Sequence, residues 1–148
     1  MHRSTRYQII SASLVALTVV VATTQTLLDP NPFIYNELPY SSYNNFIIFR
    51  QSFFHLSGRL DLYARYASEH ADFFKYSPTF ALFMGVFSPL RPQVGLVIWN
   101  LLGAFLIFWG LRSLITGAGS LLICVVLLIP ELHTSTLNSQ SNSHVAGL

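Results

Sequence analysis

The sequence predicts an all-α integral membrane protein, in which several transmembrane helices are interrupted by one long polar loop. Three observations favour this fold class. The chain of 148 residues is 52% hydrophobic and only 9% charged, whereas soluble domains carry about 25% charged residues. Residues 7–28 contain no charged side chain. Most of the charged side chains lie in residues 29–77, between that stretch and a second apolar region.

The composition also argues against two classes of protein. A formal net charge of +2 is too small to indicate a nucleic-acid-binding protein. The single cysteine, Cys124, excludes a disulfide framework. We therefore expect membrane lipid, and no nucleic acid, among the partners of the chain.

The first element is a transmembrane helix over residues 7–28, because about 20 apolar residues cross a bilayer. Arg3 and Arg6 precede it, so the positive-inside rule predicts a cytoplasmic N-terminus. A cleaved signal peptide is the alternative, but the run is long for one and no clear cleavage site follows. The sequence Asp29-Pro30-Asn31-Pro32 ends the helix, since proline has no backbone N–H to donate.

Residues 29–77 are expected to form an extracytoplasmic loop that carries two amphipathic helices. From Tyr43 to Leu56 the apolar residues recur at helical spacing, which predicts a helix in the membrane interface with its apolar side toward lipid. Gly58 is expected to end this helix. Residues 64–74 predict a second, shorter interfacial helix after a turn at Asp61-Leu62-Tyr63.

Beyond this loop the sequence predicts membrane helices of unequal length. Ser77-Pro78 is a typical helix start and opens a short membrane helix over residues 78–90. Residues 94–114 predict a transmembrane helix and residues 120–132 a short membrane helix. Residues 133–148 are expected to be a polar loop followed by the start of a truncated helix, as in a fragment of a longer multi-pass protein.

The side of the membrane on which each later segment lies is left open by the sequence. If residues 78–90 cross the membrane, Arg91 is cytoplasmic and Arg112 is outside. If that segment only dips into the bilayer, as apolar runs of this length often do, the two arginines exchange sides.

The carboxylates of the loop are the candidate catalytic groups. A general base must be a group such as a carboxylate or an imidazole within reach of the proton it accepts, and Asp61, Glu69 and Asp72 meet the first condition. A solvated helix face with charges toward water is the alternative interpretation. The histidines lack the spacing of metal ligands, so we expect no metal site and no cofactor.

Five short motifs follow one another in an order that resembles the N-terminal part of glycosyltransferase family 87. They read Asn45-Phe46-Ile47-Ile48-Phe49, Gly58-Arg59-Leu60-Asp61-Leu62-Tyr63, Lys75-Tyr76-Ser77-Pro78-Thr79-Phe80-Ala81-Leu82, Trp99-Asn100-Leu101-Leu102 and Gln140-Ser141-Asn142. The resemblance runs from about residue 43 to the end of the chain.

This resemblance implies a GT-C glycosyltransferase, a multi-pass enzyme of the bacterial inner membrane that works at the extracytoplasmic face. Such an enzyme takes a hexosyl, mannosyl or arabinofuranosyl group from a polyprenyl-phosphate sugar. The acceptor would be a glycan or glycolipid of the cell envelope. An acidic residue of the first outer loop would act as the base.

One departure from the family pattern bears on catalysis. Asn45 stands where the family has aspartate, and an amide cannot accept the proton. Asp61, Glu69 and Asp72 therefore remain as candidate bases. The resemblance implies substrate-binding roles for six further residues: Asn45, His70, Lys75, Tyr76, Gln140 and Asn142.

Two other functions are compatible with the sequence. The chain could be a non-catalytic membrane subunit that binds a partner or lipid through its loop. It could also be part of a transporter, which predicts polar residues in the middle of a span. Residues 94–111 offer only Asn100 for that role.

Overall fold

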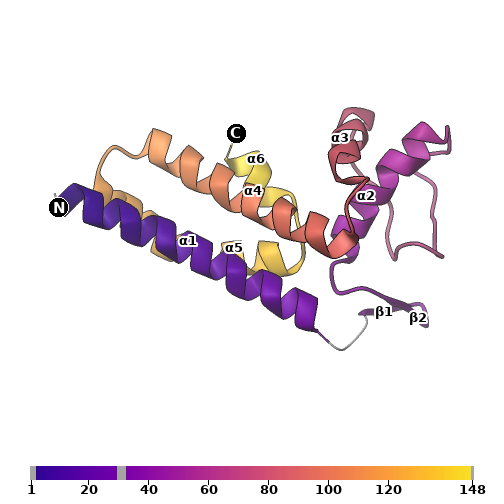
Figure 1. Ribbon diagram of the computed structural model, residues 1–148, viewed down its shortest axis with the longest axis horizontal. Helices are drawn as coiled ribbons and strands as arrows, with labels where there is room; N and C mark the ends of the chain where they lie inside the picture. Colours follow the sequence, from indigo (N-terminus) through magenta and orange to yellow (C-terminus); the bar gives the residue numbers. More distant parts are fainter. Residues whose placement is uncertain (1–2, 30–32, 148) are drawn as a thin grey trace.

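The computed structural model describes residues 3–29 and 33–147, and within them the chain is mostly helical (Figure 1). Three long helices, α1 (Arg3–Leu28), α4 (Pro92–Leu114) and α5 (Ala118–Leu137), form an elongated bundle. A smaller folded region, residues 33–91, lies at one end of this bundle. We call it the loop region.

Hydrogen bonds fix the relative directions of the three long helices. The Thr26 hydroxyl, near the end of α1, donates to the Leu137 carbonyl at the end of α5, with 3.2 Å between the oxygens. These two helices therefore run parallel. Helix α4 runs the opposite way, because Asn100 in its first half donates to the Thr23 hydroxyl at 2.9 Å. Apolar side chains fill the bundle: Val15, Val19, Ala104, Leu121, Val125 and Leu132.

The three long helices are each long and apolar enough to cross a membrane. Large apolar side chains cover their outer surfaces, as Phe105 and Leu127 show with 58% and 74% of their surface exposed. Soluble helices usually turn a polar face outward. The prediction of an all-α membrane protein is confirmed in part: the described chain is mostly helical, and three of its helices could cross a membrane by length and composition.

The third long helix is longer than the predicted segment 120–132. Helix α5 continues through Pro130 to Leu137, which gives it 20 residues. Proline is tolerated inside membrane helices, because neighbouring groups satisfy the carbonyl that it leaves free. The following short helix, α6 (Asn142–Ala146), turns back along α4. The packing is close, because a Cβ on Gly147 would overlap the backbone of Leu106.

The loop region begins with a β-hairpin that the sequence analysis did not predict. Strands β1 (Phe33–Tyr35) and β2 (Leu38–Tyr40) pair antiparallel. Asn36 and Glu37 form the two-residue turn, and both have positive φ, 49° and 66°. Two positive φ values are typical of the type I′ turn, which matches the twist of the strands it joins.

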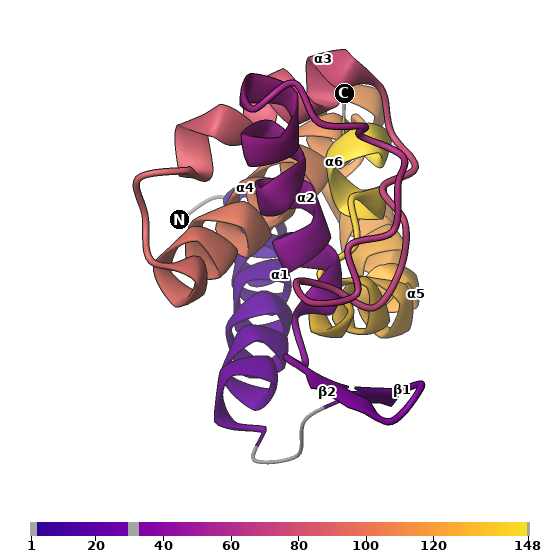
Figure 2. The same cartoon turned by 90° about the vertical axis from the view of Figure 1, so that its right-hand side faces the viewer.

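Helix α2 (Asn44–Ser57) confirms the predicted helix over residues 43–56, and Gly58 follows it as its C-cap. The prediction that the apolar side of this helix faces lipid is wrong, because this side packs against protein. Phe46, Ile48 and Phe49 are buried against the other helices of the loop region and the start of α4. Figure 2, which looks onto this end of the molecule, shows α2 and α3 in front of the bundle.

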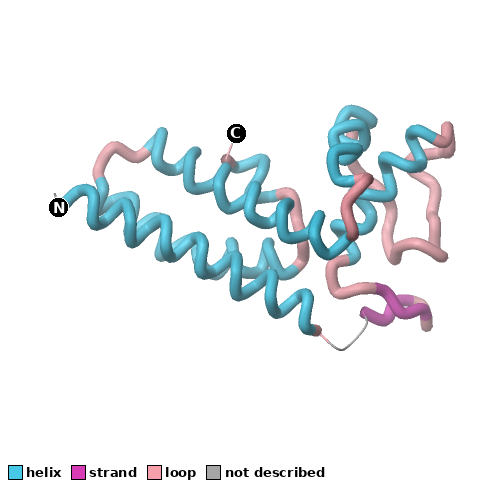
Figure 3. The backbone as a smooth tube through the Cα atoms, in the orientation of Figure 1, coloured by secondary structure: helices cyan, strands magenta, loops and turns pink. Residues whose placement is uncertain are grey.

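The second predicted interfacial helix, over residues 64–74, is wrong. This segment belongs to an irregular chain of turns, residues 58–77, which is drawn as a loop in Figure 3 and which we call the irregular segment. Side chains accept from backbone N–H groups that a helix would use: Asn44 accepts from the Ala71 N–H at 3.0 Å, and Asp72 accepts from the Phe73 N–H at 2.7 Å. Asp and Asn side chains commonly compete with helix formation in this way.

The short helix predicted over residues 78–90 is present, but it packs on α2 instead of lying among the three long helices. It consists of α3 (Pro78–Phe83) and the 3₁₀ helix η1 (Met84–Phe87). The Ser77 hydroxyl caps α3 by accepting from the Phe80 N–H at 3.2 Å, as the Ser-Pro start predicts. Both helices pack on α2, so Arg91 lies at the loop-region end, whereas α4 carries Arg112 to the opposite end with Arg6.

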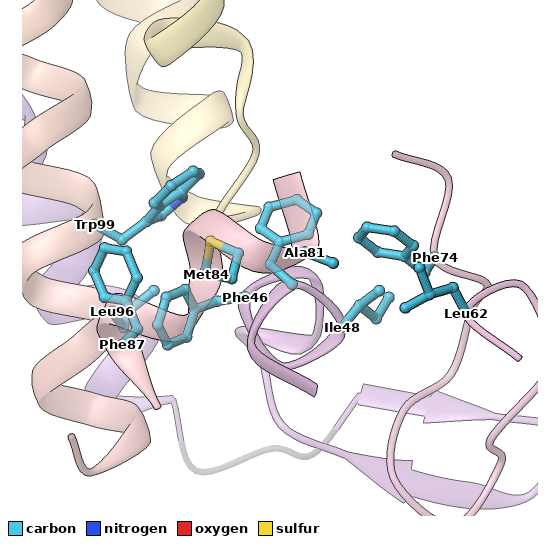
Figure 4. Packing of buried hydrophobic residues seen from close by; sticks show 10 residues of the cluster. Phe46, Ile48, Leu62, Phe74, Ala81, Met84, Phe87, Leu96 and Trp99 are labelled. Carbon is cyan, nitrogen blue, oxygen red and sulfur yellow. The ribbon is translucent and has the colours of Figure 1, made fainter. Parts of the chain in front are cut away.

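One apolar cluster holds the loop region onto the bundle. Figure 4 shows Phe46 of α2 next to Phe87, Leu96 and Trp99, while Leu62 and Phe74 of the irregular segment lie on the far side of the same cluster. Phe49 makes edge contacts with the rings of Phe80 and Trp99. The loop region is therefore a packed unit rather than a flexible connection.

Candidate functional site

The irregular segment returns along α2 and brings Glu69 to His55, a residue in the last turn of that helix. The Glu69 Oε2 atom lies 3.0 Å from the His55 Nε2 atom. The His55 side chain is 4% exposed and the Glu69 side chain 32% exposed. The carboxylate therefore has one oxygen against a buried imidazole while part of the group remains open to solvent.

His55 and His70 are neighbours in this site. The His55 ring stacks on the Tyr66 ring with 3.8 Å between centroids. His70 is 1% exposed, and its Nδ1 atom lies 2.7 Å from the Asp72 carbonyl oxygen. Burial lowers the pKa of His70, since it disfavours the charged imidazolium. Because a carbonyl oxygen can only accept, Nδ1 is the donor in this contact.

Glu69 also lines a hollow of about 460 Å³ between the hairpin and the irregular segment. Tyr40, Ser41 and Ser68 contribute polar groups to its walls. The Tyr40 hydroxyl donates to the Ala67 carbonyl at 2.7 Å and so joins the two sides. A small molecule in this hollow would therefore lie next to Glu69.

The other two predicted bases occupy different settings. Asp72 forms an ion pair with Lys75, and both side chains are more than half exposed. The hydrogen bond from Lys75 lowers the pKa of Asp72, which makes this carboxylate a weaker proton acceptor. Asp61 is engaged in its own turn through the Tyr63 N–H, and its backbone carbonyl accepts from the Tyr66 hydroxyl at 2.8 Å.

Residues of the second polar segment, 138–142, contact the loop region. The Asn45 amide donates to the Asn138 carbonyl at 2.8 Å. The Tyr76 and Ser141 hydroxyls are hydrogen-bonded at 2.9 Å. Two predicted substrate-binding residues, Asn45 and Tyr76, therefore link parts of the chain that are far apart in sequence.

Gln140 and Asn142, predicted to bind substrate, bond to each other: the Asn142 amide donates to the Gln140 side-chain oxygen at 2.8 Å. Asn142 also lines a mainly apolar cavity of about 240 Å³ inside the bundle, together with Glu131 and Ser135. The Ser135 hydroxyl is buried and has no hydrogen-bond partner among the residues that the structure describes. This cavity is separate from the hollow beside Glu69.

Sequence reasoning missed His55. It lies on a helix, far along the chain from Glu69 and His70, and no short-range spacing connects the three. Only the return of the irregular segment brings them together: each offers a ligand atom, and these atoms lie within 4.8 Å of one another.

Comparison with protein-family models, with curated proteins and with solved structures finds no match to this chain.

Proposed function

We propose that this chain is part of a multi-pass membrane glycosyltransferase, in which Glu69 is the catalytic base. The enzyme transfers a sugar from a polyprenyl-phosphate donor to a glycan or glycolipid acceptor of the cell envelope. The observation that carries the proposal is the position of Glu69. Its carboxylate is held by a buried imidazole and stays partly open to solvent, and the residue lines a hollow to which Tyr40, Ser41 and Ser68 also contribute.

In this reaction Glu69 accepts one proton. An acceptor hydroxyl in the hollow gives its proton to the carboxylate while its oxygen attacks the anomeric carbon of the donor sugar. The bond between that carbon and the phosphate oxygen breaks, and the lipid phosphate leaves with the electron pair. Such general-base catalysis contributes about 10²–10⁴-fold to a rate.

Glu69 is a better candidate than the two other acids. The ion pair with Lys75 stabilises the ionised form of Asp72 and so weakens it as a base. Asp61 uses its carboxylate to form a turn. Glu69, in contrast, is fixed through one oxygen by His55, and this leaves its second oxygen available to the acceptor.

The residues before the first span support an extracytoplasmic loop region. Arg6 lies at the start of α1, and positively charged residues close to a span favour the cytoplasmic side. Arg112 lies at the same end of the bundle, whereas the loop region carries Arg50, Arg59, Arg65, Lys75 and Arg91, so the orientation rests on the N-terminal residues. The arrangement fits a cytoplasmic N-terminus in the bacterial inner membrane. The short helices α3 and η1, which pack on α2, support the alternative in which residues 78–90 do not cross.

The remaining parts of the site fit a lipid-linked donor. Lys75 offers a positive charge near the irregular segment that could pair with a phosphate. Leu82 and Val86, 63% and 69% exposed, give α3 and η1 an apolar outer face suited to a membrane surface. The apolar cavity between the long helices has the lining that a hydrocarbon chain requires.

The test compares two isosteric substitutions in the protein as its cell makes it. Membranes are given polyprenyl-phosphate mannose with a radiolabelled sugar, and transfer to envelope material is measured. Glu69→Gln is expected to lower kcat by about 10²–10⁴-fold, because an amide cannot accept the proton. Asp72→Asn is expected to stay within a few-fold of the unsubstituted protein.

Equal activity of the unsubstituted protein and Glu69→Gln would contradict this assignment of the base. If Glu69→Gln, Asp72→Asn and Asp61→Asn all leave transfer unchanged, the result favours the alternative function, a non-catalytic membrane subunit that binds a partner through the loop region.

A further inference from the structure

His55, Glu69 and His70 together form the kind of donor set that divalent transition metals bind in proteins. Two imidazoles and one carboxylate are a frequent ligand set for zinc, with a fourth position left for water or substrate. In this chain the three ligand atoms lie within 4.8 Å of one another. Two of the three residues are almost completely buried, His55 at 3% and His70 at 1% exposed.

The surroundings hold both rings in orientations suited to metal binding. Metal-bound histidines usually donate their second ring N–H to a carbonyl or carboxylate, which fixes the tautomer and the ring plane. His70 has this arrangement already, since its Nδ1 atom lies 2.7 Å from the Asp72 carbonyl oxygen and Nε2 is left to act as a ligand. The His55 ring is held by stacking against Tyr66.

A hydrogen-bonded pair of His55 and Glu69 explains only part of this arrangement. The pair accounts for the buried ring of His55 but not for that of His70. The His70 ring is buried next to it, with 6.1 Å between the centroids of the two imidazoles. The contact between Nδ1 and the Asp72 carbonyl fixes the ring, and it leaves Nε2 as the nitrogen free to bind an ion.

We propose that His55, Glu69 and His70 bind one divalent transition-metal ion of the zinc type. Bonds to zinc are about 2.0–2.2 Å long, so ligand atoms in a tetrahedral site lie about 3.3 Å apart. The three ligand atoms must therefore move together on binding. Glu69 can supply this movement, because its side chain is 32% exposed and its carboxylate can leave the hydrogen bond to His55.

The bound ion would join α2 to the irregular segment at a second point, beside the apolar cluster. It would also occupy the carboxylate of Glu69. Since a carboxylate that ligates the ion cannot accept a proton, zinc is expected to inhibit any transfer reaction that uses Glu69 as its base. Metal binding itself does not depend on the proposed transfer activity.

The experiment measures metal binding directly. The full chain is purified in detergent, freed of metal with a chelator and titrated with Co²⁺, whose visible absorption bands report a tetrahedral site. One ion per chain is expected, displaced by Zn²⁺ and not by Mg²⁺, which prefers oxygen ligands and octahedral geometry. Glu69→Gln is expected to weaken Co²⁺ binding by at least about 10–100-fold.

Two substitutions serve as matched controls. His133→Gln removes a histidine that lies outside the cluster and is hydrogen-bonded to Gln25. Asp61→Asn removes an acid from the irregular segment, which also carries Glu69. Both substitutions should leave the Co²⁺ affinity unchanged. Glu69→His restores a ligand and should recover part of the affinity. Because Glu69 is partly exposed, circular dichroism should show that its variants remain folded.

The proposal is overturned if no saturable Co²⁺ binding occurs, or if Glu69→Gln binds as tightly as the unsubstituted chain. These outcomes are distinguishable from failure of the proposed function. If the chain binds Co²⁺ but transfers no sugar, the metal site is supported and the transferase function is contradicted. If it transfers sugar without binding Co²⁺, the transferase function is supported and the metal site is contradicted.

Discussion

Asn45 and Asn44 are adjacent at the start of α2, and their side chains have opposite hydrogen-bonding roles. The Asn45 amide donates its N–H to the Asn138 carbonyl, whereas the Asn44 oxygen accepts from the Ala71 N–H. Asn45 occupies the position at which the resemblance to glycosyltransferase family 87 predicts an acid. Its observed partner is a carbonyl oxygen, which needs a hydrogen-bond donor, and an ionised carboxylate has none.

Replacing each asparagine by aspartate separates the two roles. Asn45→Asp loses its donor and faces a carbonyl oxygen with a negative charge, so it should destabilise the chain by about 1 kcal/mol. Asn44→Asp keeps its acceptor, and both substitutions place equal charge near the same helix N-terminus. Thermal unfolding in detergent is the measurement, and identical unfolding temperatures for the two variants would contradict these roles.

At the scale of residues, the sequence could identify chemistry but not partners. Glu69 could be chosen as a candidate base because carboxylates accept protons, yet nothing in its neighbourhood along the chain indicates His55. Asn100, the one polar residue that favoured a transporter, is explained by its hydrogen bond to Thr23. Such pairings depend on the tertiary fold and have no local signal.

At the scale of elements, α2 illustrates both the strength and the limit of periodicity. Its apolar side chains recur at helical spacing, and this predicts the helix almost to its ends. The same spacing cannot distinguish burial against protein from burial in lipid. For residues 64–74, an interfacial helix was predicted, but Asn44 of α2 and Asp72 accept from backbone N–H groups of this stretch instead.

The packing of α2 against the bundle makes a specific prediction about stability. Phe46 is fully buried, in edge contact with Phe87, so Phe46→Ala should cost about 3–5 kcal/mol. Phe54, on the same helix, is 40% exposed, so Phe54→Ala should cost about 1 kcal/mol.

Limited proteolysis of the purified chain checks this difference, since residues 58–77 depend on the same cluster for their position. Phe46→Ala should be cleaved in that segment much faster than Phe54→Ala. Equal rates would mean that α2 is not anchored by its apolar side in the way the structure has it.

At the scale of the whole molecule, the sequence predicted apolar helices around a polar loop, and three long apolar helices are observed. It could not order the later segments across a membrane, because α3 and η1 are too short for hydropathy to decide. The structure supplies the missing relation: α1 and α5 end, and α4 begins, at the loop-region end. Polar groups from residues 45, 69, 76 and 138–142 gather there for the same reason.

The central claim is that the loop region lies on the extracytoplasmic side of the membrane, whereas the connection between α4 and α5 lies on the cytoplasmic side. Single cysteines test it in a Cys124→Ala background, at Ser68 in the loop region and at Thr116 in that connection, both exposed. We predict that a membrane-impermeant maleimide labels Ser68→Cys in intact spheroplasts and reaches Thr116→Cys only after permeabilisation. The reverse pattern, or labelling of both cysteines in intact spheroplasts, would contradict the account.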